Sequence, residues 1–266
     1  MAANLLTRAL GALELLAQNG RGLGLQVIAD TVDMPKSGAH RLLAELTRLD
    51  YVVQDPDSGQ YRLTGKLPSL GMRHLAGTGI IGASQPLLDR LARYSSELVR
   101  LAVVDGDRLI FIAKSQGART GLRYDPESGG EAPLFCTATA FTWLSGFSDD
   151  EAIRLIAAQG AMDPENRGPR APCNFAQVLQ QLSETRERGY GRAIDMSSPG
   201  MSAIAAAVTA ESGSQVLGIL SIGGPTARLT EDKMNEFAPE LLETAAELSS
   251  LPALERYLSP LGRCAR

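Results

Sequence analysis

The apolar positions in the first third of the chain repeat with the period of amphipathic helices. Residues 4–18 carry an apolar stripe that predicts a first helix. A second stripe, over residues 25–32, stops at Met34-Pro35, because proline lacks a backbone N–H and disfavours α geometry in the residue before it. A third stripe starts at Pro35 and continues to Leu49. The pattern predicts three helices, the last two joined by a tight turn.

Two short β-rich runs follow the third helix. Residues 51–54 and 60–63 flank a turn rich in Asp, Pro and Gly, which is typical of a β-hairpin. Three helices followed by a hairpin make a winged helix-turn-helix. Residues 65–76 then have a helical pattern with an internal proline and glycine. This segment is predicted to be a linker helix, with the domain boundary at residues 78–82.

The rest of the chain mixes helical patterns with apolar, strand-like runs. Helices are expected at residues 83–97, 136–147, 149–159 and 175–188, and a last one begins at Thr230, a good N-cap. Strands are expected at residues 98–104, 109–114, 120–124, 201–209 and 215–222. A mixed sheet with helices on its faces makes the fold class α+β.

Composition and charge add limits to this picture. The 266 residues allow one large domain or two smaller ones, and 44% hydrophobic with 21% charged residues is ordinary for a globular protein. The net charge of -4 divides unevenly, because residues 1–78 hold 8 basic and 7 acidic residues while the remainder holds 18 and 23. No signal peptide or long apolar run is visible, so we expect a cytoplasmic protein without a membrane partner.

The outer face of the third helix is cationic and rich in hydrogen-bonding groups, as major-groove recognition requires. The hairpin could lie along the phosphate backbone, where it would fix position without reading sequence. Two alternatives remain open: the basic face is only solvated, or the winged helix binds a protein instead of DNA. The predicted DNA contacts are Lys36, Ser37, His40, Arg41, Gln60 and Arg62.

Catalytic arrangements are not supported by the sequence. Both histidines, His40 and His74, lie in the N-terminal third, so the C-terminal part has none that could activate a cysteine or serine. Neither a GxxxxGK[ST] nor an HExxH motif occurs, and the three cysteines have no metal-ligand spacing. We therefore expect no enzyme activity, no cofactor and no metal.

Several short pieces of sequence occur together in a recognisable order. In the N-terminal part they are RAL at 8–10, MPKS at 34–37, HRLL at 40–43 and GQYRL at 59–63. In the C-terminal part they are LAVVDG at 101–106, PL at 133–134 with TA at 137–138, RGY at 188–190, IAA at 204–206 and SIGGP at 221–225. Through their order and spacing, the chain resembles the isocitrate lyase regulator (IclR) family of bacterial transcription factors over nearly its whole length.

The resemblance implies three segments. Residues 1–64 would form a winged helix-turn-helix DNA-binding domain, residues 65–82 a linker helix, and residues 83–258 a GAF-like mixed α/β effector-binding domain. Such proteins are homodimers or homotetramers that bind partly palindromic operators in double-stranded DNA. Their effectors are small organic acids, aromatic compounds or other catabolic intermediates.

The resemblance also implies an effector pocket at the start of the helix expected near residue 137. Backbone N–H groups at a helix N-terminus favour an anion, although the threonines here could simply cap the helix. In the family fold, polar strand residues face this loop, and apolar side chains are candidate walls. The predicted pocket residues are Thr137, Ala138, Thr139, Ala140, Asp195, Ser202, Ser221, Leu122, Tyr124 and Met201.

The chain departs from the family pattern at a few positions. Gly38 replaces a usual threonine in the recognition helix, so either the backbone approaches DNA closely there or the helix is looser. In the pocket segment, Ala140-Phe141 replaces a Gly-Lys pair, Phe135 replaces a histidine, and Met196 falls near a usual acidic position. These changes predict a more apolar pocket and favour an aromatic or partly apolar organic acid over a small, highly charged effector.

Overall fold

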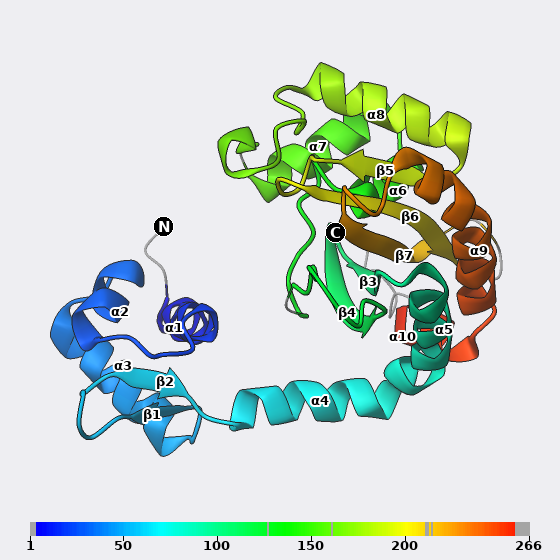
Figure 1. The fold of residues 1–266 in the computed structure, drawn as a ribbon. Helices are drawn as coiled ribbons and strands as arrows, with labels where there is room; N and C mark the ends of the chain where they lie inside the picture. The colour runs from blue at the N-terminus through cyan, green and yellow to red at the C-terminus, as the bar shows by residue number, and fades with distance from the viewer. Residues whose placement is uncertain (1–3, 127, 161, 211–212, 214, 259–266) are drawn as a thin grey trace. The chain divides into compact units, whose positions relative to one another are not determined.

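A computed structural model describes residues 4–126, 128–160, 162–210, 213 and 215–258 (Figure 1). The chain divides into two compact units, Met1–Gly77 and Thr78–Arg266. Each unit has its own hydrophobic core. Across these described ranges, no helix is both long enough and apolar enough to cross a membrane.

The N-terminal unit is a winged helix-turn-helix, as the sequence predicts. Helix α1 (Leu5–Gln18) is capped by Asn4, whose side chain accepts the Thr7 N–H at 2.8 Å. The other elements are α2 (Leu25–Thr31), α3 (Lys36–Arg48) and an antiparallel hairpin of β1 (Val52–Gln54) and β2 (Tyr61–Leu63).

Helix α3 is held in place by the apolar stripe read from the sequence. Its first residue follows Pro35, which is the N-cap and ends the turn after α2. Leu42, Leu43 and Leu46 are buried together with residues of α1, α2 and the hairpin. Each buried leucine contributes about 1.5–3 kcal/mol relative to an exposed one. This burial fixes the opposite face of α3 toward solvent.

A single glycine separates the next two helices. Helix α4 (Lys66–Thr78) buries none of its side chains, and α5 (Ile80–Ser95) begins after Gly79. Gly79 has a φ of 72°, in the left-handed region that side chains with a Cβ disfavour. The α4 hydrogen-bond pattern therefore ends at this point instead of continuing into α5.

The C-terminal unit is built on one five-stranded sheet. Every neighbouring pair in it is antiparallel, and the order is β4-β3-β7-β6-β5 (Figure 1). The strands are β3 (Leu98–Asp105), β4 (Arg108–Gln116), β5 (Gly191–Ile194), β6 (Met201–Thr209) and β7 (Val216–Pro225). The sheet is therefore antiparallel and not mixed as expected, and the unit has the α+β fold class that the sequence predicts.

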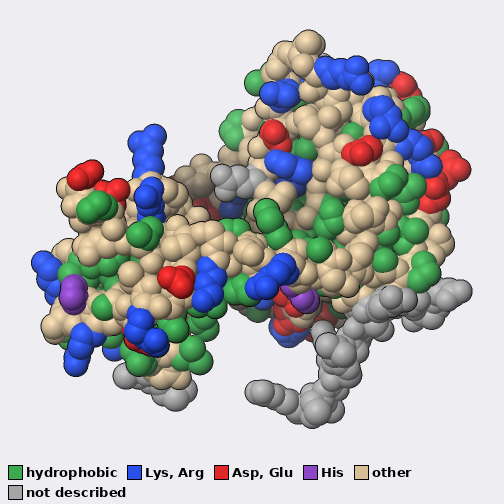
Figure 2. Space-filling model, turned by 90° about the horizontal axis from the view of Figure 1, so that it is seen from below, with side chains coloured by type: hydrophobic (Ala, Val, Ile, Leu, Met, Phe, Trp, Pro, Cys, Tyr) green, Lys and Arg blue, Asp and Glu red, His purple; other side chains and the backbone are tan. Residues whose placement is uncertain are grey.

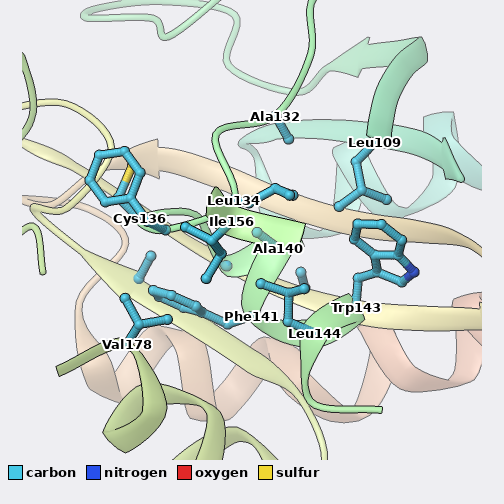
Figure 3. Close-up of a cluster of buried hydrophobic side chains, with 14 of the residues drawn as sticks. Leu109, Ala132, Leu134, Cys136, Ala140, Phe141, Trp143, Leu144, Ile156 and Val178 are labelled. Carbon is cyan, nitrogen blue, oxygen red and sulfur yellow. The ribbon is translucent and has the colours of Figure 1, made fainter. Parts of the chain in front are cut away.

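Helices cover both faces of this sheet (Figure 1). One face contacts α5 and α9 (Glu231–Ser249), to which the short α10 (Pro252–Leu258) is added. The other face contacts α6 (Ala138–Leu144), against which α7 (Asp149–Gln159) and α8 (Phe175–Arg188) pack. Figure 3 shows that Phe141, Trp143 and Leu144 of α6 lie in a buried cluster with Ile156 and Val178.

Some local predictions are wrong. Residues 120–124 form no strand, because the backbone carbonyls of Leu122 and Tyr124 accept side-chain hydrogen bonds instead of joining a sheet. The helix predicted at 136–147 is shorter, since Thr137 is the N-cap of α6. Strand β5, helix α10 and the 3-10 turn η1 (Pro164–Asn166) are not predicted by the apolar pattern.

Candidate functional site

The predicted recognition residues of α3 lie together on one exposed face. Lys36, Ser37, His40 and Arg41 are all exposed. Positions three and four apart are neighbours on a helix, so these four side chains form a continuous surface opposite the buried leucines. Figure 2 shows Lys, Arg and His side chains on the surface of the N-terminal unit, with hydrophobic side chains between them.

The cations on α3 differ in whether their charge is already paired. Arg48, near the helix end, donates to both carboxylate oxygens of Glu45, at 2.9 and 2.6 Å. Lys36 and Arg41 form no ion pair with any residue in the described ranges. The positive charge available to an anionic partner is therefore concentrated in the first half of α3.

The hairpin presents the two remaining predicted DNA contacts. Gln60 and Arg62 are both exposed, while Tyr61 between them is buried in the core of the unit. The turn is ordered by Asp55, whose carboxylate accepts the N–H groups of Asp57 and Ser58 and the Ser58 hydroxyl. These hydrogen bonds lower the pKa of Asp55, led by the Ser58 N–H.

The C-terminal unit contains a pocket of about 520 Å³. Seven of the ten predicted pocket residues line it: Tyr124, Thr137, Ala138, Thr139, Met201, Ser202 and Ser221. Thr137 lines the pocket, and its hydroxyl also accepts the Ala140 N–H at 3.1 Å as the cap of α6.

Three predicted pocket residues lie outside the lining. Ala140 is fully buried in the core cluster, and Leu122 is 71% exposed. Asp195 instead closes the loop after β5, where its carboxylate accepts the Gly200 N–H at 2.6 Å and the hydroxyl of Thr226 at 3.3 Å. Asp195 therefore positions a lining segment, because that loop supplies two serines to the pocket.

Small side chains on the sheet create the hollow. Ala193 of β5, Ala203 of β6 and Gly223 of β7 lie on neighbouring strands and all line the pocket. Larger residues at these positions would fill the space between the sheet and the start of α6. The other lining residues are Leu98, Arg100, Phe111, Pro126, Gly130, Glu131, Pro133, Arg167, Ser197 and Ser198.

Arg100 is a lining residue that the sequence reasoning missed. It comes from β3, and its guanidinium carbon lies 3.3 Å from the centroid of the Phe111 ring, in a cation–π contact. Burial lowers the pKa of Arg100 to about 10, so the side chain still carries its charge at neutral pH. Its signal in the sequence is that it interrupts the apolar run of residues 98–104.

Arg167 is a second missed arginine, and it reaches the pocket from an irregular segment. The residues after it dock on the end of β5, because Gly168 N–H donates to the Met196 carbonyl at 2.9 Å and Arg170 N–H to the Asp195 carbonyl at 2.9 Å. A Cβ at Gly168 would overlap the Asp195 carbonyl oxygen, so this approach requires glycine. No periodic pattern in the sequence marks this contact.

A buried ion pair holds the loop that supplies Tyr124. Arg228 donates to both carboxylate oxygens of Glu97, at 2.6 and 2.8 Å, and the Glu97 side chain is only 6% exposed. A third donor of Arg228 reaches the Leu122 carbonyl at 2.9 Å, and Gln116 donates to the Tyr124 carbonyl at 3.0 Å. This wall of the pocket is thus tied to the sheet and to the start of α9.

The residues whose departure from the family pattern predicted a more apolar pocket lie outside the pocket lining. Phe135, Phe141 and Met196 are buried in the core cluster and do not line the pocket. Cys136, in the same cluster, has its pKa raised to about 11 by burial and remains a thiol at neutral pH. The described part of the chain contains no group of His, Cys, Asp or Glu residues that could hold a metal ion.

Comparison with protein families gives two matches that together span most of the chain. Residues 72–250 match the model of the bacterial transcriptional regulator IclR C-terminal domain, and residues 5–56 match the IclR helix-turn-helix domain. The HTH-type transcriptional regulator KdgR of Escherichia coli K12 is 28% identical, over 93% of this chain and 92% of KdgR. The transcriptional repressor IclR of the same strain is 25% identical, over 92% of this chain and 88% of its own length.

Solved structures show the same fold. An IclR transcriptional regulator from Alicyclobacillus acidocaldarius has a TM-score of 0.78 at 25% identity, covering 94% of this chain and 98% of its own. An IclR homologue from Microbacterium hydrocarbonoxydans, crystallised in complex with 4-hydroxybenzoate, has a TM-score of 0.75 at 18% identity, covering 95% of this chain and 99% of its own.

Proposed function

The chain belongs to the IclR family of bacterial transcriptional regulators, and from this premise we propose that it binds a specific operator under the control of a small organic acid. The effector is an aromatic or partly apolar acid, and the operator is a partial palindrome in double-stranded DNA. The observation that carries the proposal is the exposed face of α3, with Lys36 and Arg41 free of ion pairs within the described part of the chain.

On the DNA side, the chemistry of this face supports contact with both bases and phosphates. Arg41 is the candidate for base reading, because arginine donates two hydrogen bonds to guanine in the major groove. Lys36 at the start of α3 is suited to a phosphate, as are Gln60 and Arg62 on the hairpin. Ser37 and His40 complete the proposed contact surface.

On the effector side, the composition of the pocket supports a ligand that is partly apolar and partly acidic. Phe111, Tyr124 and Met201 offer apolar and aromatic contact, while Arg100 offers a charge that an acid would pair with. The Microbacterium homologue was crystallised in complex with 4-hydroxybenzoate, which is a precedent for an aromatic acid as the effector.

Exposed apolar residues in the N-terminal unit support self-association. Leu5 and Leu6 are each 66% exposed on α1, and Met72 is 70% exposed on α4. We propose that a second copy of the chain covers such residues in a homodimer or homotetramer. Two recognition helices would then enter successive major grooves about 34 Å apart. Light scattering of the full chain tests this, and a monomeric mass would refute it.

Control by the effector requires a coupling between the two units. We propose that effector binding shifts the placement of the two DNA-binding heads through the segment 65–82. The coupling free energy equals the difference in effector affinity between the two arrangements. An effector that binds tightly and leaves operator affinity unchanged would refute this mechanism.

The test of the function is fluorescence-anisotropy binding to the DNA upstream of the gene for this chain, across a salt series and with a panel of aromatic and aliphatic acids. Specific binding should weaken steeply with salt, because phosphate contacts release counterions. Arg41→Ala should cost about 1–3 kcal/mol of binding free energy if Arg41 reads a base.

Arg48→Ala is the matched control, because this arginine lies on the same helix and is already paired with Glu45. Its loss should change operator affinity less than the loss of Arg41. Absence of specific binding at any salt concentration would favour the alternative, a winged helix that binds protein. Equal effects of the two substitutions would remove Arg41 from the proposed reading residues.

A further inference from the structure

We propose that Arg167 is the residue that binds the acidic group of the effector, and that the neutral part of the effector extends across the sheet away from it. The inference rests on the proposed function, because it assigns an orientation to the ligand in the same pocket. It follows from three features of the lining: the available donors around Arg167, the balanced charges on the opposite side, and the uncharged floor between the two.

Arg167 reaches the pocket at the β5 edge of the sheet. The Gly168 N–H next to it donates to the Met196 carbonyl at 2.9 Å, just beyond the end of β5. The Nε of Arg167 is buried, and the guanidinium forms no hydrogen bond or ion pair with any residue that the structure describes. A buried donor without a partner costs free energy, which an anionic ligand would recover. The donors of Arg167 are therefore available to an acid.

Two hydroxyl groups line the pocket on the same side. Ser197 and Ser198 belong to the loop that follows Asp195, and neither hydroxyl forms a hydrogen bond within the described ranges. The carboxylate of Asp195 is occupied inside this loop, where it accepts the Gly200 N–H at 2.6 Å and the Thr226 hydroxyl at 3.3 Å. A guanidinium and two hydroxyl groups can donate several charge-assisted hydrogen bonds to one carboxylate.

The β4 side of the pocket holds carboxylates as well as cations. Asp125 forms an ion pair with Lys114 of β4, at 2.6 Å, and also interacts electrostatically with Arg100. Glu131 lines the pocket, and its backbone forms a bridge with Ile110 of β4. Arg100 and Lys114 are thus matched by two carboxylates on this side. An acid gains less here than beside Arg167.

An uncharged floor separates the two sides. Strands β4 and β5 are the edges of the sheet and lie four strand spacings apart (Figure 1). At about 4.8 Å for each spacing, their backbones are about 19 Å apart. Between them, Gly223 of β7, Ala203 of β6 and Ala193 of β5 pair in one row and line the pocket. With its acidic group at Arg167, a ligand can extend its neutral part along this row toward the Phe111 ring.

Calorimetric titration of the full chain with acids and their amides measures the preference for an acidic group. The pairs are benzoate against benzamide, phenylacetate against phenylacetamide, and cinnamate against cinnamamide. Each amide has nearly the shape of its acid and carries no charge. We expect the acid to bind about tenfold more tightly or better in at least one pair. Equal or tighter binding of the amide in every pair, or no binding of any acid, would overturn the inference.

Substitutions assign this preference to Arg167. Arg167→Met should weaken acid binding about tenfold or more and leave amide binding within about threefold, because only the acid uses the charge. Arg167→Lys should keep part of the preference. Arg170→Met is the control, because Arg170 is exposed three residues further on and does not line the pocket. A preference for the acid that survives Arg167→Met would overturn the inference.

Arg100→Met separates the two arginines of the lining. Arg100 already interacts with Asp125, and its guanidinium carbon lies 3.3 Å from the centroid of the Phe111 ring. We therefore expect the ratio of acid to amide affinity to fall less in Arg100→Met than in Arg167→Met. The fluorescence of the buried Trp143 verifies that each variant is folded. A ratio that collapses in Arg100→Met and persists in Arg167→Met would place the acid on the β4 side and refute the assignment.

The same preparations separate this inference from the proposed function. Operator binding by fluorescence anisotropy reports on DNA recognition and needs no ligand. Operator binding together with a preference for acids that does not depend on Arg167 would overturn the inference alone. A preference that is lost in Arg167→Met, in a chain that binds no operator, would overturn the proposed function and leave the assignment of Arg167 in place.

Discussion

Replacing Arg228 by methionine should destabilise the C-terminal unit, because it leaves the carboxylate of Glu97 buried without its cation. The two hydrogen bonds at 2.6 and 2.8 Å would be lost while the Glu97 side chain is only 6% exposed. Breaking a buried pair by removing one partner costs about 3–5 kcal/mol. Arg228 is itself 39% exposed, so solvent screens part of the interaction, and we expect a loss of about 2–4 kcal/mol.

Arg154→Met provides the matched comparison. Arg154 also bridges carboxylates, with Glu151 at 2.7 Å and Asp107 at 3.3 Å, but all three side chains are between 40% and 51% exposed. Exposed ion pairs contribute about 0–1 kcal/mol. The two variants remove the same kind of side chain and differ chiefly in the burial of the carboxylate that remains.

Urea unfolding measures the difference. Trp143 is the only tryptophan in the sequence and is buried in the C-terminal unit, so its fluorescence follows that unit. A double variant with Glu97→Gln and Arg228→Met should recover part of the loss, since it removes the buried charge. Equal losses for Arg228→Met and Arg154→Met, or a loss below about 1 kcal/mol for Arg228→Met, would refute the reasoning.

Three further predictions concern the two units separately. Gly38→Ala should stabilise the N-terminal unit by up to about 1 kcal/mol in thermal unfolding, because the new Cβ meets the flexible end of Met34 at 3.2 Å and the Cδ of Pro35 at an ordinary 4.0 Å. A simultaneous loss of operator affinity would mean that DNA approaches the helix backbone there. Ala203→Leu should fill the pocket floor and abolish stabilisation by organic acids in thermal-shift assays, while operator affinity in anisotropy stays unchanged. Hydrogen bonds from Ser58 lower the pKa of Asp55, so its contribution to stability is present above about pH 4 and is lost as the pH falls through the folded-state pKa. Asp55→Asn should therefore differ from the parent in thermal unfolding at pH 7 and converge with it at lower pH; a difference that persists at low pH would contradict this.

The sequence alone predicts those elements whose formation depends on neighbouring residues in the chain. The apolar stripe of α3, the proline before it and the hairpin turn each depend on neighbouring residues, so their periodicity predicts them. The Thr230 cap of α9 is equally local, since its side chain accepts the Lys233 N–H. Strand β5 is different: it has four residues, follows a helix after two residues and, among the described residues, pairs only with β6.

The pocket shows the limit of such reasoning. Ser202 and Ser221 were predicted from the family fold and do line it, whereas Arg167 is brought in by backbone hydrogen bonds to residues nearly thirty positions away. Contacts between residues so far apart in the chain produce no periodic pattern in the sequence. Phe135 and Met196 do not contribute to the apolar character of the pocket for the same reason, because their side chains are buried in the core cluster.

Helix α4 also has an evolutionary consequence. None of its side chains is buried, so substitutions along it open no cavity in the core of either unit. Its sequence is therefore constrained by helix propensity and by surface contacts, such as the hydrogen bond from Lys66 to the Leu49 carbonyl. Recombination at this segment could join the DNA-reading head of one regulator to the sensing unit of another without rebuilding either core. Chimeric regulators that pair a new operator with a new effector are best made by joining the two parent chains within α4.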